Sequence, residues 1–542
     1  MSRKRSASGL QIRGLMLDPA RLTERHEFYF DLLPRLAEWG FNTLWWHFVD
    51  DEGFVLKLDA HPELASPHAF SKAQMRRLVR LAAELGIDVV PEVECLGHAR
   101  YITRLPQYAH LQDGDAHHFN AVCPSNPDTT RLLREVIEET ADVFPSPYFH
   151  AGLDEVDLSG CRRCRRKIAR MGHWRLFAGH VGALHRIITG CGKRMIMWAD
   201  HVEREPRVLK AIPKDVILAH WHYGRVNVRR DFERSLEAGF EIIGASSMLR
   251  HGNVIMPHRS QMENTEGMAA EARRLARRGM LGAVNTWWTP RRILRDAALP
   301  LAAYTGHLFA GGQADLPAGE AGRAAFFGGY ARRRFDLAGK TVGDAINMLH
   351  EQMLLLTDFK ALAFDSPADM LHAAAAGASD QRQEQARKLR GATDCLAGAA
   401  GKVKMASREY KALVLAGQVA CRLIDNGKDL ARAVDCYRKA EDMRDRGYEP
   451  ARAADLLDQA GACLAGIASR LDVLCREVSA EWDRTRHPGD VKKALRPVTD
   501  PCPADSLLGR LVRSREFVRS LHRALAAAVK AYRRGGPFPV GV

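Results

Sequence analysis

Acidic and aromatic side chains in roughly the first three hundred residues stand directly after short apolar runs. The densest example is the segment from His150 to Glu155, which places the carboxyl groups of Asp154 and Glu155 side by side. Neighbouring acids and imidazoles can pass protons to and from a reacting group, which is general acid–base chemistry. Tryptophan rings would stack on the C–H faces of a sugar while acids bind its hydroxyl groups. The other candidate site residues are Arg13, Asp50, Asp51, His98, Trp198, Trp221, Tyr223, Trp287 and Trp288.

The elements that must position these residues are short apolar strands alternating with amphipathic helices. The predicted strands are Ile12–Asp18, Thr43–Asp50, Asp88–Glu94, Tyr148–Glu155, Arg194–Asp200, Val216–Tyr223, Phe240–Ser247 and Gly282–Thr289. The predicted helices between and after them include Lys72–Leu85, Thr129–Val143, Arg165–Thr189, Ala269–Arg278 and Ala297–Phe309. Such alternation requires a parallel sheet, because each helix carries the chain back across the sheet. The number of units, in about 300 residues, is that of a (β/α)8 TIM barrel, which we expect for residues 1–320.

An open, doubly wound sheet is the alternative to the barrel. That fold usually carries a glycine-rich phosphate loop after its first strand, whereas the first strand here runs into Asp18-Pro-Ala-Arg21. Each acid taken singly could be a helix N-cap, and each tryptophan could be core packing. Acids or aromatic residues at seven strand ends in succession are better explained by one shared mouth, because a barrel places catalytic residues at the C-terminal ends of its strands.

Strand patterns disappear in the last third of the chain. From about Val342 to Tyr532 the sequence is rich in Ala, Leu, Arg and Glu at helical spacing. We predict an all-helical C-terminal domain over residues 335–542, with its Met and Leu stripes forming the core. We expect this domain to contribute no catalytic residue.

The composition is that of a globular protein: 542 residues, 46% hydrophobic and 27% charged. No apolar stretch is long enough to span a bilayer, and no signal-peptide core follows the basic N-terminus. We therefore predict a cytoplasmic protein without a membrane partner. The net charge of +15 could suit nucleic acid, but the densest basic run, Arg162 to Arg170, lacks interleaved aromatics and reads as a solvated helix face. We expect no nucleic-acid partner.

The chain has eleven cysteines, an odd number at irregular spacing, and we expect free thiols. Cys161 and Cys164 form a single C-x-x-C motif. A structural zinc site needs two more ligands, and no second C-x-x-C exists. We interpret the pair as ordinary thiols at the start of a helix, with a metal or redox role as the alternative. We expect no metal and no cofactor.

Five segments together resemble glycoside hydrolase family 20, the β-N-acetylhexosaminidases. The segment His150-Ala-Gly-Leu-Asp154-Glu155 resembles the family motif H-x-G-x-D-E. In chain order, the other four segments are Arg13 to Asp18, Asn42 to Gly53, Pro91 to His98 and Met197 to Asp200. The resemblance spans roughly residues 10–310 and is nearest to the short, intracellular hexosaminidase D-like branch.

The resemblance implies a role for each matching residue. Glu155 would be the general acid and later the base, and Asp154 would orient the substrate's 2-acetamido group, whose carbonyl oxygen attacks the anomeric carbon. His98, with Asp50 or Asp51 behind it, would tune the acid. Arg13 would grip sugar hydroxyls.

The aromatic positions match the family less completely. Trp198, Trp221 and either Trp287 or Trp288 would wall the acetamido pocket. The seventh strand, Ile242-Ile-Gly-Ala-Ser-Ser-Met248, lacks the Tyr and the acid that many members carry there. We predict Tyr223 as the substitute.

These observations predict an exo-acting, retaining β-N-acetylhexosaminidase that releases terminal N-acetylglucosamine or N-acetylgalactosamine. One alternative is a sugar-binding barrel without turnover, which the presence of both Asp154 and Glu155 disfavours. Another is a barrel glycosidase for a different glycan, which the missing tyrosine favours. Whether the protein forms a homodimer is left open.

Overall fold

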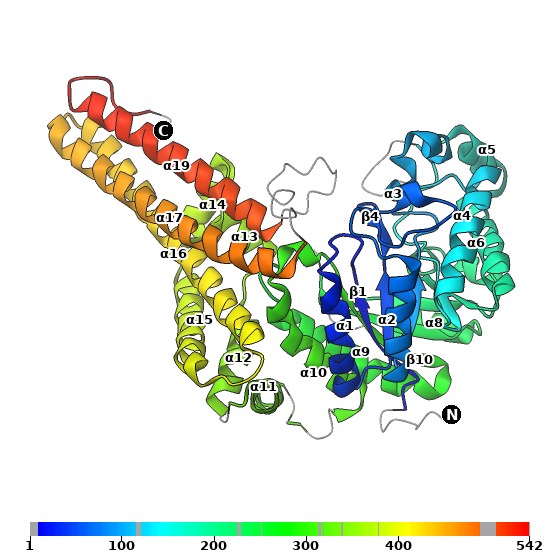
Figure 1. The fold of residues 1–542 in the computed structure, drawn as a ribbon. Coiled ribbons are helices and arrows are strands. Elements are labelled where there is room, and N and C mark those ends of the chain that lie inside the picture. The colour runs from blue at the N-terminus through cyan, green and yellow to red at the C-terminus, as the bar shows by residue number, and fades with distance from the viewer. Residues whose placement is uncertain are drawn as a thin grey trace.

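The protein, seen as a computed structural model, combines a closed barrel with a group of long helices (Figure 1). The described residues are 9–114, 121–224, 229–250, 252–312, 316–317, 319–337, 340–377, 379–487 and 506–540. Within them, no helix is both long and apolar enough to cross a membrane.

Eight parallel strands close into one barrel, in the order β1-β10-β9-β8-β7-β6-β5-β2. The strands are β1 (Ile12–Leu17), β2 (Thr43–His47), β5 (Asp88–Glu92), β6 (Tyr148–His150), β7 (Arg194–Trp198), β8 (Ile217–Trp221), β9 (Ile242–Leu249) and β10 (Met280–Trp287). A small antiparallel pair, β3 (Val49–Asp50) and β4 (Gly53–Phe54), follows β2. The predicted TIM barrel is confirmed, and the open sheet is wrong because β1 pairs with β10 as well as with β2.

Helices carry the chain between the strands. They are α1 (His26–Trp39), α2 (Lys72–Glu84), α3 (Arg100–Thr103), α4 (Pro127–Val143), α5 (Arg162–Met171), α6 (His173–Gly190), α7 (Asp200–Arg204), α8 (Arg229–Glu237), α9 (Arg259–Leu275) and α10 (Leu299–Phe309). Local sequence explains their starts. Ser71 and Gln74 form a capping box at α2, and the Asn126 side chain caps α4 with Pro127 at its first position.

The largest differences from the predicted boundaries concern two helices and one strand. The single helix expected over Arg165–Thr189 is two helices, because Gly172 takes a φ of 86° and ends α5. Helix α9 begins at Arg259, well before the predicted Ala269, because the His258 side chain accepts a hydrogen bond from the backbone N–H of Ser260 and caps it. Strand β6 stops at His150 because the following residues turn sharply.

The C-terminal part of the chain is helical. Its helices are α11 (Glu320–Phe335), α12 (Lys340–Gln352), α13 (Leu356–Leu362), α14 (Pro367–Gly377), α15 (Asp380–Ala399), α16 (Ser407–Asp445), α17 (Pro450–Thr485) and α19 (Leu507–Tyr532). Helices α16, α17 and α19 pack along one another and extend away from the barrel (Figure 1). The alanine and leucine stripes of these helices are buried, which is the packing that the sequence predicts.

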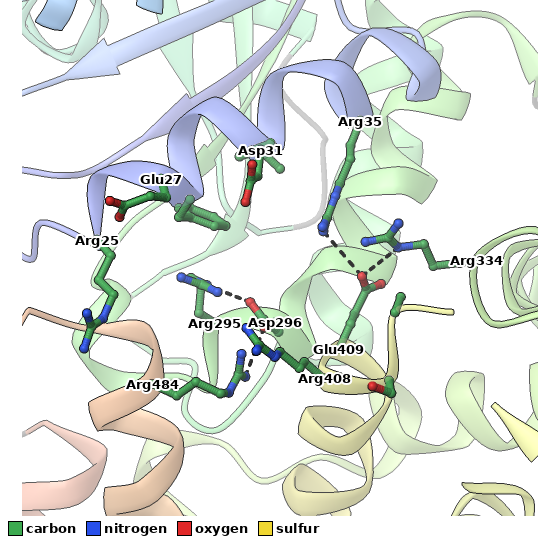
Figure 2. A pocket seen from close by; sticks show the side chains of 14 residues that line it. Arg25, Glu27, Asp31, Arg35, Arg295, Asp296, Arg334, Arg408, Glu409 and Arg484 are labelled. Carbon is green, nitrogen blue, oxygen red and sulfur yellow. Dashed lines mark hydrogen bonds and ion pairs between the residues drawn. The ribbon is translucent and has the colours of Figure 1, made fainter. Parts of the chain in front are cut away.

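The helices meet the barrel through apolar packing and a buried ion pair. Arg486 is 1% exposed, and its guanidinium lies 2.6 Å from the Glu24 carboxylate in the loop after β1. Beside this junction lies a cleft of about 630 Å³ between α1 and the start of α16 (Figure 2). We call it the arginine cleft, since six arginines line it: Arg25, Arg35, Arg295, Arg334, Arg408 and Arg484.

Candidate active site

A cavity of about 410 Å³ opens at the C-terminal ends of the barrel strands. We call it the barrel cavity. Every strand end contributes at least one side chain to its wall, which is where barrels place reacting groups. The lining residues are Arg21, His47, Asp50, Glu94, His98, Asp154, Glu155, Trp198, Trp221, Tyr223, Arg250, Gly252 and Trp288.

Eight of the predicted site residues line this cavity together. They are Asp50, His98, Asp154, Glu155, Trp198, Trp221, Tyr223 and Trp288. The other four predicted residues, Arg13, Asp51, His150 and Trp287, do not line it.

Arg13 lies at the opposite rim of the barrel. It is the second residue of β1, so it is at the N-terminal end of that strand. Its Nε donates to the carbonyl of Gly40 at 2.8 Å, and Gly40 ends α1 on the side where strands begin. The predicted contact between Arg13 and the substrate therefore has no support in the geometry. Arg21, in the loop after β1, supplies the arginine of the cavity.

Trp287, His150 and Asp51 lie behind the cavity wall. Trp287 packs in the outer core between strands and helices, whereas Trp288 faces the cavity, because neighbouring residues of a strand point to opposite sides. His150 is fully buried inside the barrel, where burial lowers the pKa of its imidazole to about 4. The Asp51 carboxylate lies 3.7 Å from His98 and accepts the backbone N–H of Arg100 at 3.0 Å.

Asp154 and Glu155 stand on a strained turn after β6. Gly152, Leu153 and Glu155 have φ angles of 65°, 81° and 49°, a region that residues other than glycine rarely adopt. A side chain at Gly152 would also come within 2.0 Å of the Glu94 carboxylate. The backbone N–H of Glu155 donates to Asp200 at 3.2 Å, which holds the far side of the turn.

His98 connects the acid pair to a buried charge network. Its Nε2 lies 3.8 Å from the Asp154 carboxylate and 3.5 Å from that of Glu155, and its Nδ1 lies 3.2 Å from Asp50. Burial lowers the pKa of His98, but the negative charges of Asp50 and Asp154 outweigh it and raise the pKa well above the usual value. The imidazole is therefore a cation beside the acid pair.

Asp50 is the ionised anchor of this network. Its carboxylate lies 2.7 Å from the Arg21 guanidinium and 2.8 Å from His47 Nε2. Burial raises the pKa of Asp50, and the cations Arg21 and His98 lower it by more, so that it lies well below its usual value. Arg21 also lies over the Trp288 ring, with 5.1 Å to its centre.

The remaining acids have raised pKa values. Burial, with the charges of Asp200 and Glu155, raises the pKa of Asp154 to about 7 against the opposing effect of His98. Burial raises the pKa of Asp200 to about 6. Burial and the charge of Asp154 raise the pKa of Glu94 well above its usual value. Perturbed acids of this kind gather at sites of proton transfer.

Aromatic rings complete the wall. The indole N–H of Trp198 donates to Glu92 at 2.8 Å, and that of Trp288 donates to the Tyr223 hydroxyl at 2.8 Å. The Trp221 and Tyr223 rings lie 5.2 Å apart. With the acids opposite, the cavity presents flat apolar faces and hydrogen-bonding groups together, as a pyranose ring requires.

Sequence reasoning missed five lining residues: Arg21, His47, Glu94, Arg250 and Gly252. Glu94 stood in the recognised segment after Pro91, and Arg21 followed a strand end by four residues, so position alone could have identified both. Arg250 was hidden because β9 continues to Leu249, beyond the predicted end at Ser247. Arg250 places a cation at the end of β9, the strand that lacks the tyrosine found in many family members.

The barrel part of the sequence is similar to known proteins. Residues 11–289 match the family described as glycosyl hydrolase family 20, catalytic domain. A β-hexosaminidase of Vibrio furnissii is 29% identical over 255 residues, covering 40% of this chain and 41% of that protein. β-Hexosaminidase subunit A1 of Dictyostelium discoideum is 32% identical over 163 residues, covering 28% of this chain and 29% of that one.

One solved structure, a β-N-acetylhexosaminidase, aligns with a TM-score of 0.50 at 19% identity, over 61% of this chain and 78% of that one. At this identity the likeness concerns the fold alone. This chain spans less than half the length of the two curated relatives. The family match covers just over half of the sequence and includes every strand of the barrel. The chain belongs to glycosyl hydrolase family 20.

Proposed function

We propose that the protein is an exo-acting, retaining β-N-acetylhexosaminidase in which the substrate's own acetamido group is the nucleophile. The observation that carries this proposal is which acids of the barrel cavity are already held by neighbouring groups and which can reach a substrate. Asp50 is held between Arg21, His47 and His98, and Glu94 is fully buried with a pKa that burial and the charge of Asp154 raise well above its usual value. The adjacent pair Asp154 and Glu155 remains available for the reaction.

An adjacent pair cannot act as most retaining glycosidases do. Those enzymes place an acid and a carboxylate nucleophile on opposite sides of the anomeric carbon, about 5–5.5 Å apart. Asp154 and Glu155 both approach the same His98 nitrogen, at 3.8 and 3.5 Å, so the two carboxylates share one side of the cavity. A nucleophile on the sugar removes the need for an opposing carboxylate.

Glu155 is the proposed general acid. Its side chain is about one-third exposed at the cavity wall, where a leaving group can depart, whereas the Asp154 side chain is nearly buried. Glu155 would protonate the glycosidic oxygen and then take a proton from the incoming water. The His98 cation can hold the deprotonated carboxylate between these two steps.

Asp154 is the proposed partner of the acetamido group. Its Oδ1 is buried and has no hydrogen-bond partner in the described part of the chain. An amide N–H of the substrate would satisfy that oxygen and turn the carbonyl toward the anomeric carbon. The carboxylate would then stabilise the positive charge of the cyclised intermediate, an interaction that grows in the transition state.

The aromatic wall and Arg250 are proposed to hold the sugar. Trp198, Trp221 and Trp288 would enclose the acetamido methyl group, and the Tyr223 hydroxyl would donate to its carbonyl oxygen. Tyr223 suits that role because it accepts the Trp288 N–H and so keeps its own proton for the substrate. The names of the curated relatives, which are β-hexosaminidases, support the substrate class.

The deciding experiment compares chromogenic N-acetylglucosaminide, N-acetylgalactosaminide and plain glucoside substrates. The first two should be hydrolysed and the glucoside should not, because it lacks the nucleophile. A thiazoline mimic of the cyclised intermediate should inhibit strongly, as transition-state-like ligands do. Equal turnover of the glucoside would reject the mechanism, and absence of all turnover with retained sugar binding would favour a binding protein.

We infer that residues 335–542 support the barrel without touching the substrate. Leu356 donates its backbone N–H to Gly252 at 2.9 Å, and Gly252 lines the barrel cavity. The helical part thus supports one cavity wall from behind. Substituting its acids and histidines one at a time should leave kcat intact, and a folded variant without turnover would contradict this inference.

A cytoplasmic location is also proposed. None of the ten described cysteines is in a disulfide, although the sulfurs of Cys123, Cys161 and Cys164 lie close together. Reduced thiols in this number suit a reducing compartment. Fractionation of the native host should recover the activity with cytoplasmic markers, and recovery outside the cell would contradict the proposal.

A further inference from the structure

Three cysteines and one aspartate meet beside the barrel, outside the barrel cavity. The Cys123 sulfur lies 3.4 Å from that of Cys161 and 3.5 Å from that of Cys164. One carboxylate oxygen of Asp113 joins them, and the four ligand atoms all lie within 4.8 Å of one another. None of these four residues lines the barrel cavity.

The Asp113 carboxylate is buried with one oxygen unsatisfied. Asp113 is 5% exposed, and its Oδ2 is buried without a hydrogen-bond partner in the described residues. Burying an unpaired carboxylate oxygen is costly, so such groups normally have a partner or bind a metal. Here the neighbouring groups are sulfurs that are themselves metal ligands.

The backbone is built to bring the four residues together. An isolated antiparallel β-bridge between Gln112 and Val122 holds Asp113 and Cys123 on two neighbouring segments of the backbone. On the other side, Cys161 donates its N–H to the Asp113 carboxylate at 3.4 Å. Gly160 permits this approach, because a Cβ there would lie 1.7 Å from the Asp113 carbonyl oxygen.

We propose that Asp113, Cys123, Cys161 and Cys164 form a structural zinc site. Thiolates bind Zn²⁺ tetrahedrally, and two sulfurs at about 2.3 Å from the metal are about 3.8 Å apart, close to the spacings seen here. Three sulfur ligands select a soft or borderline ion over Mg²⁺ or Ca²⁺. Four protein ligands leave no open position, which is typical of a structural site.

The helix that follows directs a backbone N–H at the Cys161 sulfur. Cys161 is the N-cap of α5, and its sulfur accepts the backbone N–H of Cys164 at 3.3 Å. A helix N-terminus stabilises negative charge. Four anionic ligands around Zn²⁺ also leave a net negative charge, and α5 carries the densest basic run of the chain, Arg162 to Arg170, beside it. The basic run and the C-x-x-C motif thus acquire one common explanation.

The site would hold the segment that carries the acid pair. Only five residues separate Glu155 from Cys161, and Leu158 between them is fully buried. A metal at Cys161 and Cys164 would tie the end of this segment to the Asp113–Cys123 loop. Glu155 and its strained turn would then be fixed at both ends, by β6 and by the metal.

The first test measures metal in the purified full-length protein by plasma mass spectrometry. We expect about one zinc per chain in the parent protein, and loss of most of it in Cys123→Ser and Cys164→Ser. Cys191→Ser, a partly buried thiol outside the cluster, is the matched control and should keep its zinc. Protein without zinc after growth in zinc-supplemented medium, or Cys164→Ser with unchanged zinc, would overturn the proposal.

A second measurement does not depend on folded variants. The parent protein, freed of metal by a chelator and loaded with Co²⁺, should show thiolate-to-cobalt charge-transfer absorption and the visible bands of tetrahedral Co²⁺. Octahedral Co²⁺ bands alone, or a disulfide within the cluster detected by mass spectrometry in protein purified under reducing conditions, would refute the site. This result is independent of the proposed hydrolase activity, because it reads only the metal and its ligands.

Discussion

The arginine cleft and the barrel cavity differ in how their buried acids are satisfied. The arginine cleft is the larger, at about 630 Å³ against about 410 Å³ for the barrel cavity, and it contains more charge. In the cleft, Glu409 accepts from Arg334 at 2.8 Å and also pairs with Arg35 (Figure 2). The Tyr330 hydroxyl donates to the same carboxylate. Asp296 is likewise bound, by Arg295 at 2.6 Å and Arg484 at 3.1 Å.

The barrel cavity leaves acid oxygens unsatisfied instead. Asp154 Oδ1 and Glu94 Oε2 are buried without a hydrogen-bond partner among the described residues. The backbone is strained at His98, Leu153 and Glu155, which all have positive φ. Strain and unpaired polar atoms cost stability, and they persist where a ligand uses them. Unsatisfied acids, and not the volume or the number of charges, therefore distinguish the barrel cavity from the arginine cleft.

The largest expected effect is at the acid pair. Glu155→Gln keeps the shape but removes proton donation, so kcat/KM for substrates with poor leaving groups should fall about 10²–10⁴-fold. Activated aryl glycosides leave without full protonation, so their first step should suffer less. Asp154→Asn should slow both kinds of substrate, because the amide cannot balance the developing positive charge.

Steady-state kinetics with a series of aryl leaving groups separates the two roles. A steeper dependence on leaving-group pKa is expected for Glu155→Gln than for Asp154→Asn. Identical dependences in both variants would end the proposed division of labour between the two acids. Binding of N-acetylglucosamine, followed by calorimetry, should survive Glu155→Gln and serves as the control for folding.

A smaller loss is expected at Tyr223. Tyr223→Phe removes the hydroxyl proposed to donate to the acetamido carbonyl, so kcat should fall about 10²-fold, the lower range for a lost donor to a developing charge. Tyr304→Phe is the matched control, since its hydroxyl binds Glu266 outside the cavity. Equal kinetics for both variants would show that another group binds the acetamido oxygen.

A shift of the pH profile is expected at Asp200. The pKa of Asp154 is raised to about 7, partly by the Asp200 charge, so the ionised Asp154 that the mechanism needs is lost as the pH falls through that value. Asp200→Asn keeps an oxygen for the Glu155 N–H and removes the charge. The acidic limb of kcat/KM should move to lower pH, by about one unit.

The exposed acid Asp394, in α15, provides the control for this shift. Asp394→Asn should leave the profile unchanged because the residue lies far from the cavity in the helical part. An acidic limb that stays in place in Asp200→Asn would show that Asp154 is not the group whose ionisation limits the reaction.

The sequence predicts the barrel well because strands and helices differ in the spacing of their apolar residues. All eight strands lie where the apolar runs predict them, and the strand-end rule brings Asp50, His98 and Asp154 into one cavity. Trp287 and Trp288 show the limit of that rule. Which of two neighbours faces inward depends on the strand register, and a run of apolar residues does not specify it.

Site residues in loops are hard to predict from the sequence for a different reason. Arg21 reaches the cavity from the loop after β1, whereas Arg13 matches the family motif but lies at the other end of the same strand. The meeting of Cys123 with Cys161 joins residues 38 positions apart through two irregular loops. No periodic pattern encodes such contacts, so only the fold reveals the four proposed zinc ligands together.

The smallest effect on catalysis is expected in the arginine cleft. Glu409 is buried and balances the partly exposed Arg35 and Arg334, so Glu409→Gln would leave these two cations without their counter-charge. Losing the charge of one partner in such a partly exposed network should cost about 1–3 kcal/mol of the free energy of unfolding, which a urea or thermal melt can measure. The kcat/KM of the folded fraction should stay within about two-fold of the parent value, because no cavity residue moves. Glu384→Gln, at an exposed pair with Arg387, is the control and should change neither property. If Glu409→Gln instead lowered kcat/KM at unchanged stability, the cleft would belong to substrate binding, and satisfied acids would no longer distinguish a structural hollow from an active one.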